Sequence, residues 1–177
     1  IRGMIGTYNN NTEIVVGYGP YFERKGLLNK LIRFDTLYIA MQYISLALAQ
    51  KPYMGVGRNL SYRKSTFMNN KGFTSHYNIP SGDDDLFISQ VANKHNTDIF
   101  IDSEIRVESE PKRTWGTWIR QKRRHYSTGV KYKPQTNRIL GFLLGSRLAY
   151  YPTLVALFFL PHSFDLSVGN IYYYVVI

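Results

Sequence analysis

The sequence predicts an α/β domain, followed by a basic amphipathic helix and then by a hydrophobic helix long enough to cross a membrane. Short apolar runs bounded by glycine or turn residues, at 13–17 and 98–101, are typical of buried strands, and helical patterns separate them. Segment 112–126 combines cations with two tryptophans, as an interfacial helix does. Segment 139–160 is almost continuously apolar. We therefore expect three regions, covering residues 1–111, 112–138 and 139–177.

The composition narrows the classes of partner. Among 177 residues, 22 are Lys or Arg and 12 are Asp or Glu, which gives a net charge of +10 and indicates anionic partners. The absence of cysteine excludes disulfides and thiolate zinc sites. The chain begins at Ile1 and ends within the apolar run 171–177, so we expect a fragment of a longer protein.

The first region alternates between strands and helices. A helical pattern from Gly26 to Gln50 is apolar on a wide face and stops at Lys51-Pro52, because proline cannot continue a helix. Its continuous apolar run is too short to cross a bilayer, so we expect a core or interface helix. The other expected elements are strands at 13–17, 98–101 and 105–108, a loop with a short strand at 54–63, and a helix at 85–93.

The last two regions carry the membrane signals. Segment 129–137 reads as a basic loop, and segment 139–160 has the length of a bilayer core if it is helical. Arg147 and Pro152 interrupt it, and a buried soluble helix is the alternative interpretation. Because cations crowd its N-terminal side, we expect the residues before Ile139 to lie in the cytoplasm.

The acidic triplet Asp83-Asp84-Asp85 is the most unusual feature of this basic chain. Three adjacent carboxylates repel one another, which raises the pKa of a carboxyl group and favours a general base. The alternative is a helix start, in which Ser81 or Asp83 caps the helix and the acids favour its dipole. A calcium loop fits poorly, since its carboxylates occur at alternate positions.

Two further patterns are weak when taken singly. Segment 121–125 reads Gln-Lys-Arg-Arg-His, and on a helix Gln121 and Arg124 share a face where an arginine pair can hold a diphosphate. The alternative, non-functional interpretation is a basic helix face exposed to solvent. Asn59 follows Gly57-Arg58, where it would bind a substrate or brace the acidic turn.

Taken together and in this order, the patterns resemble the acceptor-side half of processive-type family 2 glycosyltransferases, whose relatives include cellulose, hyaluronan and chitin synthases. Segment 52–64 resembles the family's glycine-Asn-aromatic-Arg stretch, Ser81-Gly82-Asp83 its Thr-Glu-Asp motif, and segment 121–125 its Gln-x-x-Arg-Trp motif. The resemblance runs from about Thr12 to the C-terminus. It implies a partial GT-A, Rossmann-like fold followed by an interface helix and a membrane helix.

The resemblance also implies site residues. Asp83 matches the catalytic base, and Asp84 is its rival, because a shift of the match by one residue places Asp84 at that position. The residues matched to substrate and diphosphate binding are Gly57, Asn59, Gln121, Arg124 and His125, with Trp118 as another stacking face. Gly82 stands where the family has Glu, and His125 replaces the Trp that holds a growing sugar chain.

The implied reaction is inverting transfer of a hexose-type sugar from a nucleotide-diphosphate donor to a hydroxyl of a saccharide or lipid-linked acceptor. A divalent metal, Mg²⁺ or Mn²⁺, is expected, but the family's Asp-x-Asp motif is missing. We therefore expect its ligands upstream of Ile1, no metal ligand in this chain, and an inactive fragment. The expected setting is cell-envelope polysaccharide or glycolipid synthesis at a bacterial inner membrane, with the catalytic part cytoplasmic and no nucleic-acid partner.

Other classes of function stay open at this point. A nucleic-acid-binding module would use the basic region 112–133, and a non-catalytic membrane-associated domain would need only the two last helices. A glycosidase would need a second carboxylate at a defined separation. Convergence of Asp83, Asn59, Gln121 and Arg124 on one cleft would favour the transferase.

Overall fold

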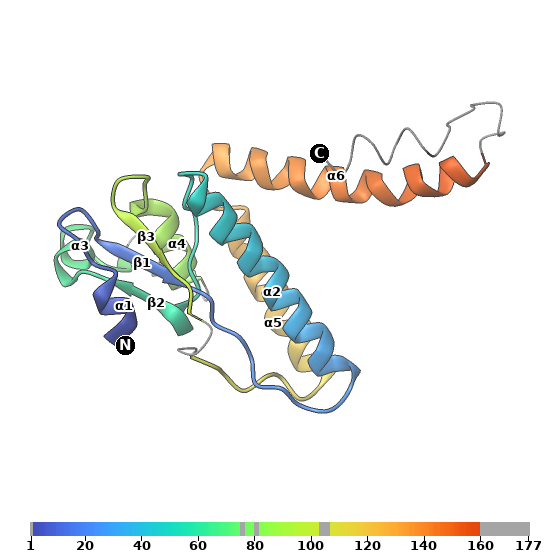
Figure 1. Ribbon diagram of the computed structural model, residues 1–177, viewed down its shortest axis with the longest axis horizontal. Helices are drawn as coiled ribbons and strands as arrows, with labels where there is room; N and C mark the ends of the chain where they lie inside the picture. The colour runs from blue at the N-terminus through green and yellow to red at the C-terminus, as the bar shows by residue number, and fades with distance from the viewer. Residues whose placement is uncertain (1, 75–76, 80–81, 103–106, 160–177) are drawn as a thin grey trace. The chain divides into compact units, whose positions relative to one another are not determined.

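The computed structural model describes residues 2–74, 77–79, 82–102 and 107–159. Its elements are α1 (Arg2–Gly6), β1 (Ile14–Gly17), α2 (Leu27–Leu48), the short 3₁₀ helix η1 (Gly57–Asn59), β2 (Leu60–Tyr62), α3 (Lys64–Asn69), α4 (Asp83–Val91), β3 (Thr97–Phe100), α5 (Trp115–Gly129) and α6 (Pro134–Phe159). Figure 1 shows their order along the chain. Residues up to Asn137 form one compact unit, and Arg138 begins a second. The chain therefore has a mixed α/β architecture, as the sequence predicts.

A small mixed sheet organises the first unit. Its strand order is β2-β1-β3, with β1 antiparallel to β2 and parallel to β3. In this register Val16 lies opposite Leu60 on one side and Ile99 on the other. All four residues of β1 are buried, as expected for the central strand of a sheet covered on both faces.

The core forms where helices pack on this sheet. Ile32 and Tyr43 of α2 and Phe87 of α4 are almost fully buried together with β1. The Tyr43 hydroxyl donates to the carbonyl of Gly17 at 2.9 Å, which ties α2 to the end of β1. A cluster of rings, Tyr62, Phe67, Phe73 and Phe87, links β2, α3 and α4 through centroid distances of 5.0–6.0 Å.

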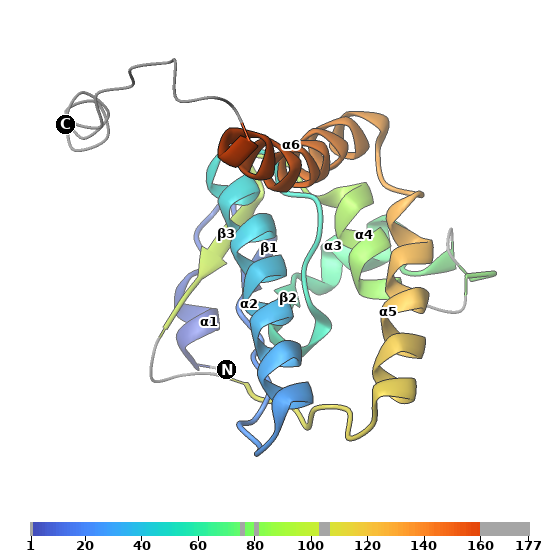
Figure 2. The same cartoon turned by 90° about the vertical axis from the view of Figure 1, so that its right-hand side faces the viewer.

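The helices α2 and α5 run in the same direction, and Figure 2 shows their ribbons set apart from each other. The ammonium of Lys122 on α5 joins the carboxylate of Asp35 on α2, with Nζ–O distances of 2.7 and 3.0 Å. Both side chains are largely withdrawn from solvent, so this ion pair is less screened than a surface pair.

The second unit carries most of α6, whose described residues are exposed from Gly141 onward. Segment Pro134–Leu157 is long and apolar enough to cross a membrane by length and composition. Pro152 lies inside the helix and cannot donate a backbone hydrogen bond to the preceding turn.

Several predicted boundaries need correction. The basic loop expected at 129–137 is confined to 130–133, because α5 continues to Gly129 and α6 begins at Pro134. The helix expected at 85–93 begins two residues earlier and includes the whole acidic triplet. The strand expected at 105–108 falls partly outside the described residues, and 107–108 form no strand. The helix α3 was not predicted, because its six residues are too few for a clear period.

Candidate active site

The acidic triplet forms the first turn of α4, and its three carboxylates have different environments. Asp83 is exposed, Asp84 is half-buried and Asp85 is buried. The helix begins after Gly82, whose φ of 80° is left-handed and favours glycine. The N-cap residue is Gly82, which has no side chain, so the expectation that Asp83 caps the helix is wrong, and Ser81 lies outside the described residues.

Asp84 connects α4 with the glycine loop. Its Oδ2 accepts a hydrogen bond from the backbone N–H of Gly57 at 2.7 Å, and its Oδ1 accepts from the N–H of Asp85 at 2.9 Å. A Cβ at residue 57 would lie 2.9 Å from Oδ2, so the carboxylate approaches the backbone closely because residue 57 is glycine. Backbone N–H donors on both oxygens therefore fix the orientation of the Asp84 carboxylate.

Asp85 points into a pair of buried tyrosines. Burial raises the pKa of Asp85 to about 7, the charge of Asp84 adds to that shift, and a hydrogen bond with Tyr132 opposes it. The rings of Tyr53 and Tyr132 meet edge to face, 5.5 Å apart. The raised pKa expected for the base is therefore found at Asp85, the one member of the triplet that solvent barely reaches.

The loop that follows Gly57 braces the end of β1. Asn59 is buried and its Nδ2 donates to the carbonyl of Tyr18 at 2.8 Å, so it does not brace the acidic turn. Arg58 donates to the carbonyl of Gly19 at 2.6 Å, and its guanidinium lies 4.1 Å from the ring centroid of Tyr21. Tyr21 is not among the site residues that the sequence predicts, because its only local signal is an aromatic ring after Gly19-Pro20.

The basic helix α5 is the third element of this site, beside the start of α4 and the glycine loop. Gln121 Nε2 donates to the hydroxyl of Tyr21 at 3.2 Å, which links this helix to Arg58 through one ring. Thr128 is fully buried against Gly82, where an added Cβ would meet its Cγ2 at 2.6 Å. The start of α4, the glycine loop and α5 therefore meet, although 71 positions of sequence separate Gly57 from Thr128.

The electrostatic environment of His125 also places α5 near the start of α4 and the glycine loop. Partial desolvation lowers the pKa of His125, and the charges of Arg124, Lys122 and Arg58 lower it further. The carboxylate of Asp84 opposes this shift. His125, whose side chain is exposed, thus lies within electrostatic reach of the acidic turn and of the glycine loop.

A family model described as "Glycosyl transferase family group 2" matches residues 11–177. The chain belongs to this family. No curated protein and no solved structure matches the chain. The family assignment made from segments 52–64, 81–83 and 121–125 is confirmed, and it establishes glycosyl transfer in general as the activity of this glycosyltransferase.

The remaining predicted residues of the glycosyltransferase lie at the edges of this junction. Arg124 is exposed beside His125. Trp118 is half-buried and contacts Trp115 edge to face, with centroids 5.8 Å apart, one helical turn before Gln121. Of the residues proposed from the sequence, the structure joins Gly57 and Asp84 by a hydrogen bond and places His125 within electrostatic reach of Asp84, while Asn59 turns towards the sheet.

The described part of the chain does not fit a metal ion. It contains no group of three or more His, Asp or Glu side chains that could hold one. Within the triplet, both oxygens of Asp84 accept backbone hydrogen bonds and Asp85 bonds to Tyr132. No step of the reaction is therefore assigned to a metal held by these residues.

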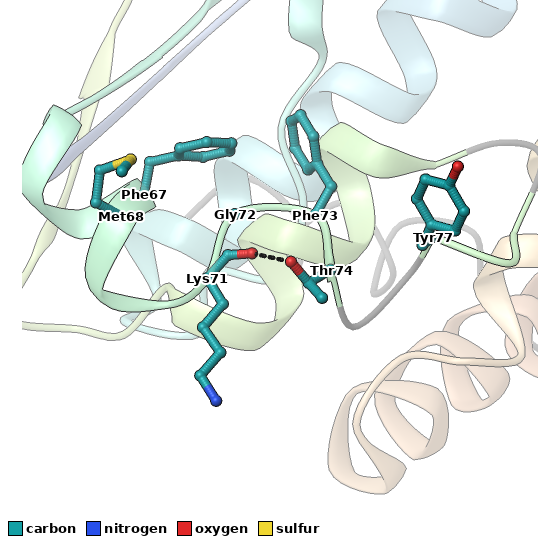
Figure 3. A pocket seen from close by; sticks show the side chains of 7 residues that line it. All are labelled: Phe67, Met68, Lys71, Gly72, Phe73, Thr74 and Tyr77. Carbon is teal, nitrogen blue, oxygen red and sulfur yellow. Dashed lines mark hydrogen bonds between the residues drawn. The ribbon is translucent and has the colours of Figure 1, made fainter.

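A shallow pocket lies beyond the ring cluster of the glycosyltransferase (Figure 3). Its lining residues are Phe67, Met68, Lys71, Gly72, Phe73, Thr74 and Tyr77. The Thr74 hydroxyl donates to the carbonyl of Lys71 at 2.6 Å and closes the turn after α3. The rings of Phe67 and Phe73 face into the pocket, whereas the side chain of Lys71 extends away from them.

Proposed function

We propose that this glycosyltransferase transfers a sugar, with inversion, from a nucleotide-diphosphate donor to an acceptor hydroxyl, and that an aspartate at the start of α4 is the general base. One observation carries the proposal. The carboxylate of Asp84 is held by the N–H of Gly57 and lies within electrostatic reach of His125. These interactions join an acidic turn, a glycine loop and a basic helix. Acceptor activation and diphosphate binding require these three parts.

Asp83 is the proposed base. It is exposed at the first position of a rigid helix, and no described hydrogen bond occupies its carboxylate, so an acceptor hydroxyl can reach it. Asp84 is the rival, but two N–H groups already hold its oxygens, which favours a positioning role. In the step, Asp83 takes the hydroxyl proton while the acceptor oxygen bonds to the anomeric carbon and the bond from that carbon to the diphosphate breaks.

The basic helix would stabilise the departing nucleoside diphosphate. Arg124 is exposed, and Gln121 and His125, three residues before it and one residue after it on α5, can also donate hydrogen bonds. Charge stabilisation aimed at a leaving group acts mainly in the transition state, so it raises turnover. Gly57 would position the Asp84 carboxylate, Asn59 would hold the loop in place, and Trp118 would offer a stacking face.

The rest of the proposal follows the family resemblance. It comprises a partial GT-A fold in which residues 1–111 form the acceptor-side half, a Mg²⁺ or Mn²⁺ cofactor, and a saccharide or lipid-linked acceptor. It also places the enzyme in polysaccharide or glycolipid synthesis at a bacterial inner membrane, with the catalytic part cytoplasmic. Segment Pro134–Leu157 supports the membrane location, because it is long enough to span a bilayer.

The experiment is a comparison of carboxamide variants in the full-length enzyme. Asp83→Asn and Asp84→Asn are each assayed for nucleoside diphosphate release from a panel of nucleotide sugars, with Glu108→Gln as an exposed control. We expect Asp83→Asn to lose transfer by at least about 100-fold, as the loss of a general base does, while its melting temperature stays unchanged. Near-normal turnover of Asp83→Asn beside an inactive Asp84→Asn would move the base to Asp84, and activity in both would refute the proposal.

A further inference from the structure

The helix α2 has two apolar faces, and only one of them contacts the core. Ile32, Ala40 and Tyr43 are buried on the inner face. On the opposite face, a stripe of large side chains recurs every seven residues and stays exposed: Leu27 (66%), Phe34 (59%), Met41 (51%) and Leu48 (70%). A spacing of seven residues is close to two helical turns, so these four side chains lie in one line along the helix.

An apolar stripe of this length is normally shielded from water by another surface. Soluble helices normally carry polar residues on the face opposite the core, and a helix that is apolar on all sides is normally buried. The stripe runs the full 22 residues of α2, from its first residue to its last. A contiguous exposed apolar surface of this kind marks an interaction site for another molecule or for a membrane.

The charges beside the stripe indicate which cover fits. The helices α2 and α5, which run in the same direction (Figure 2), together carry six Lys or Arg residues against one carboxylate, Asp35. That carboxylate is already paired with Lys122. A second copy of the chain would present the same excess of positive charge and be repelled, whereas an anionic surface is complementary.

The side chains of α5 favour lipid over an acidic protein. Trp115, Ile119 and Tyr126 are exposed and follow one another at helical spacing, with Arg120 and Arg123 among them. Tryptophan, tyrosine and arginine next to apolar residues are the composition of helices that rest in the headgroup region of a membrane. In addition, the candidate membrane span begins at Pro134, only five residues after α5 ends.

We propose that the outer stripe of α2, defined by Leu27, Phe34, Met41 and Leu48, inserts into the headgroup region of an anionic bilayer. Arg120 and Arg123 of α5 bind the lipid phosphates beside it. The first unit is then a membrane-contacting body in its own right, separately from the span in α6. The proposal concerns binding and does not depend on which aspartate is the base.

The absence of cysteine allows a direct test in the complete chain. Phe34→Cys and Met41→Cys are labelled with an environment-sensitive fluorophore, with Ser65→Cys on the exposed side of α3 as the matched control. Each protein is reconstituted into phosphatidylcholine vesicles with and without phosphatidylglycerol, and the label is challenged with a spin-labelled phospholipid. Far-UV circular dichroism verifies the fold of each variant.

We expect the labels at positions 34 and 41 to shift to the blue and to lose several times more fluorescence to the spin-labelled lipid than the label at 65, with the larger effect in phosphatidylglycerol. Equal quenching at all three positions overturns the proposal. So does an intermolecular disulfide through unlabelled Phe34→Cys, which would show that a second copy covers the stripe. Quenching that is the same with and without phosphatidylglycerol overturns the electrostatic part, since the cations would then play no role.

Discussion

The Asp84 carboxylate accepts a hydrogen bond from the backbone N–H of Gly57 at 2.7 Å, across 27 residues of sequence. This contact fixes the distance between the acidic turn and the glycine loop, because a charged acceptor makes a strong hydrogen bond. It also explains why residue 57 has no side chain, since a Cβ there would lie 2.9 Å from the same oxygen.

Gly57→Ala therefore tests the junction without removing a functional group. The methyl group must displace the Asp84 carboxylate, so we expect sugar transfer to fall strongly while the fold survives. Nucleoside diphosphate release in the full-length enzyme measures the effect. Gly116→Ala is the control, because nothing lies within 4 Å of its added Cβ and alanine is favoured in a helix by about 1 kcal/mol. Equal activity of the two variants would show that Asp84 need not be held at Gly57.

Asp85→Asn tests the buried carboxyl group through pH. The pKa of Asp85 is raised from 3.8 to about 7, so the folded state binds the proton more tightly than the unfolded state. Its stabilising contribution is present below pH 4 and is lost as the pH rises through 7. We expect the melting temperature of the wild type to fall more between pH 5 and about 8 than that of Asp85→Asn. Parallel pH curves for the two proteins would contradict the raised pKa.

Tyr132→Phe removes the hydroxyl that bonds to Asp85 and keeps the ring. Because this bond opposes the upward shift, we expect the pKa of Asp85 to rise further in the variant. The lost bond should cost about 1–2 kcal/mol of unfolding free energy. Chemical denaturation at pH 5 and at pH 8 measures both effects. Tyr53→Phe is the matched control, since its ring packs on Tyr132 and no described hydrogen bond uses its hydroxyl.

Gly82→Ala tests the packing of α4 on α5. The added Cβ would meet Thr128 Cγ2 at 2.6 Å, and the φ of 80° is unfavourable for alanine, so we expect a loss of about 1–3 kcal/mol in unfolding free energy. In a double-mutant cycle, Thr128→Ala should recover the steric part and leave the backbone part. Full additivity of the two changes would show that residues 82 and 128 do not interact.

Local sequence patterns determined much of the secondary structure of this protein. The apolar run at β1, the helical period of α2 and the apolar length of α6 are properties of short segments, so their elements were predicted within a few residues. The family was also recognised from short motifs. The end of α5 was missed because the run into Gly129 carries no apolar period, and packing of Thr128 on Gly82 stabilises that turn.

Only the tertiary structure decided how the three aspartates differ. In sequence they are equivalent neighbours, but a helix turns each by about 100°, so one faces solvent, one faces Gly57 and one enters the core. The same geometry turned Asn59 towards Tyr18 and exposed the outer stripe of α2. The sequence by itself thus determined the elements and the family, and long-range packing decided which side chain of each motif reaches the junction.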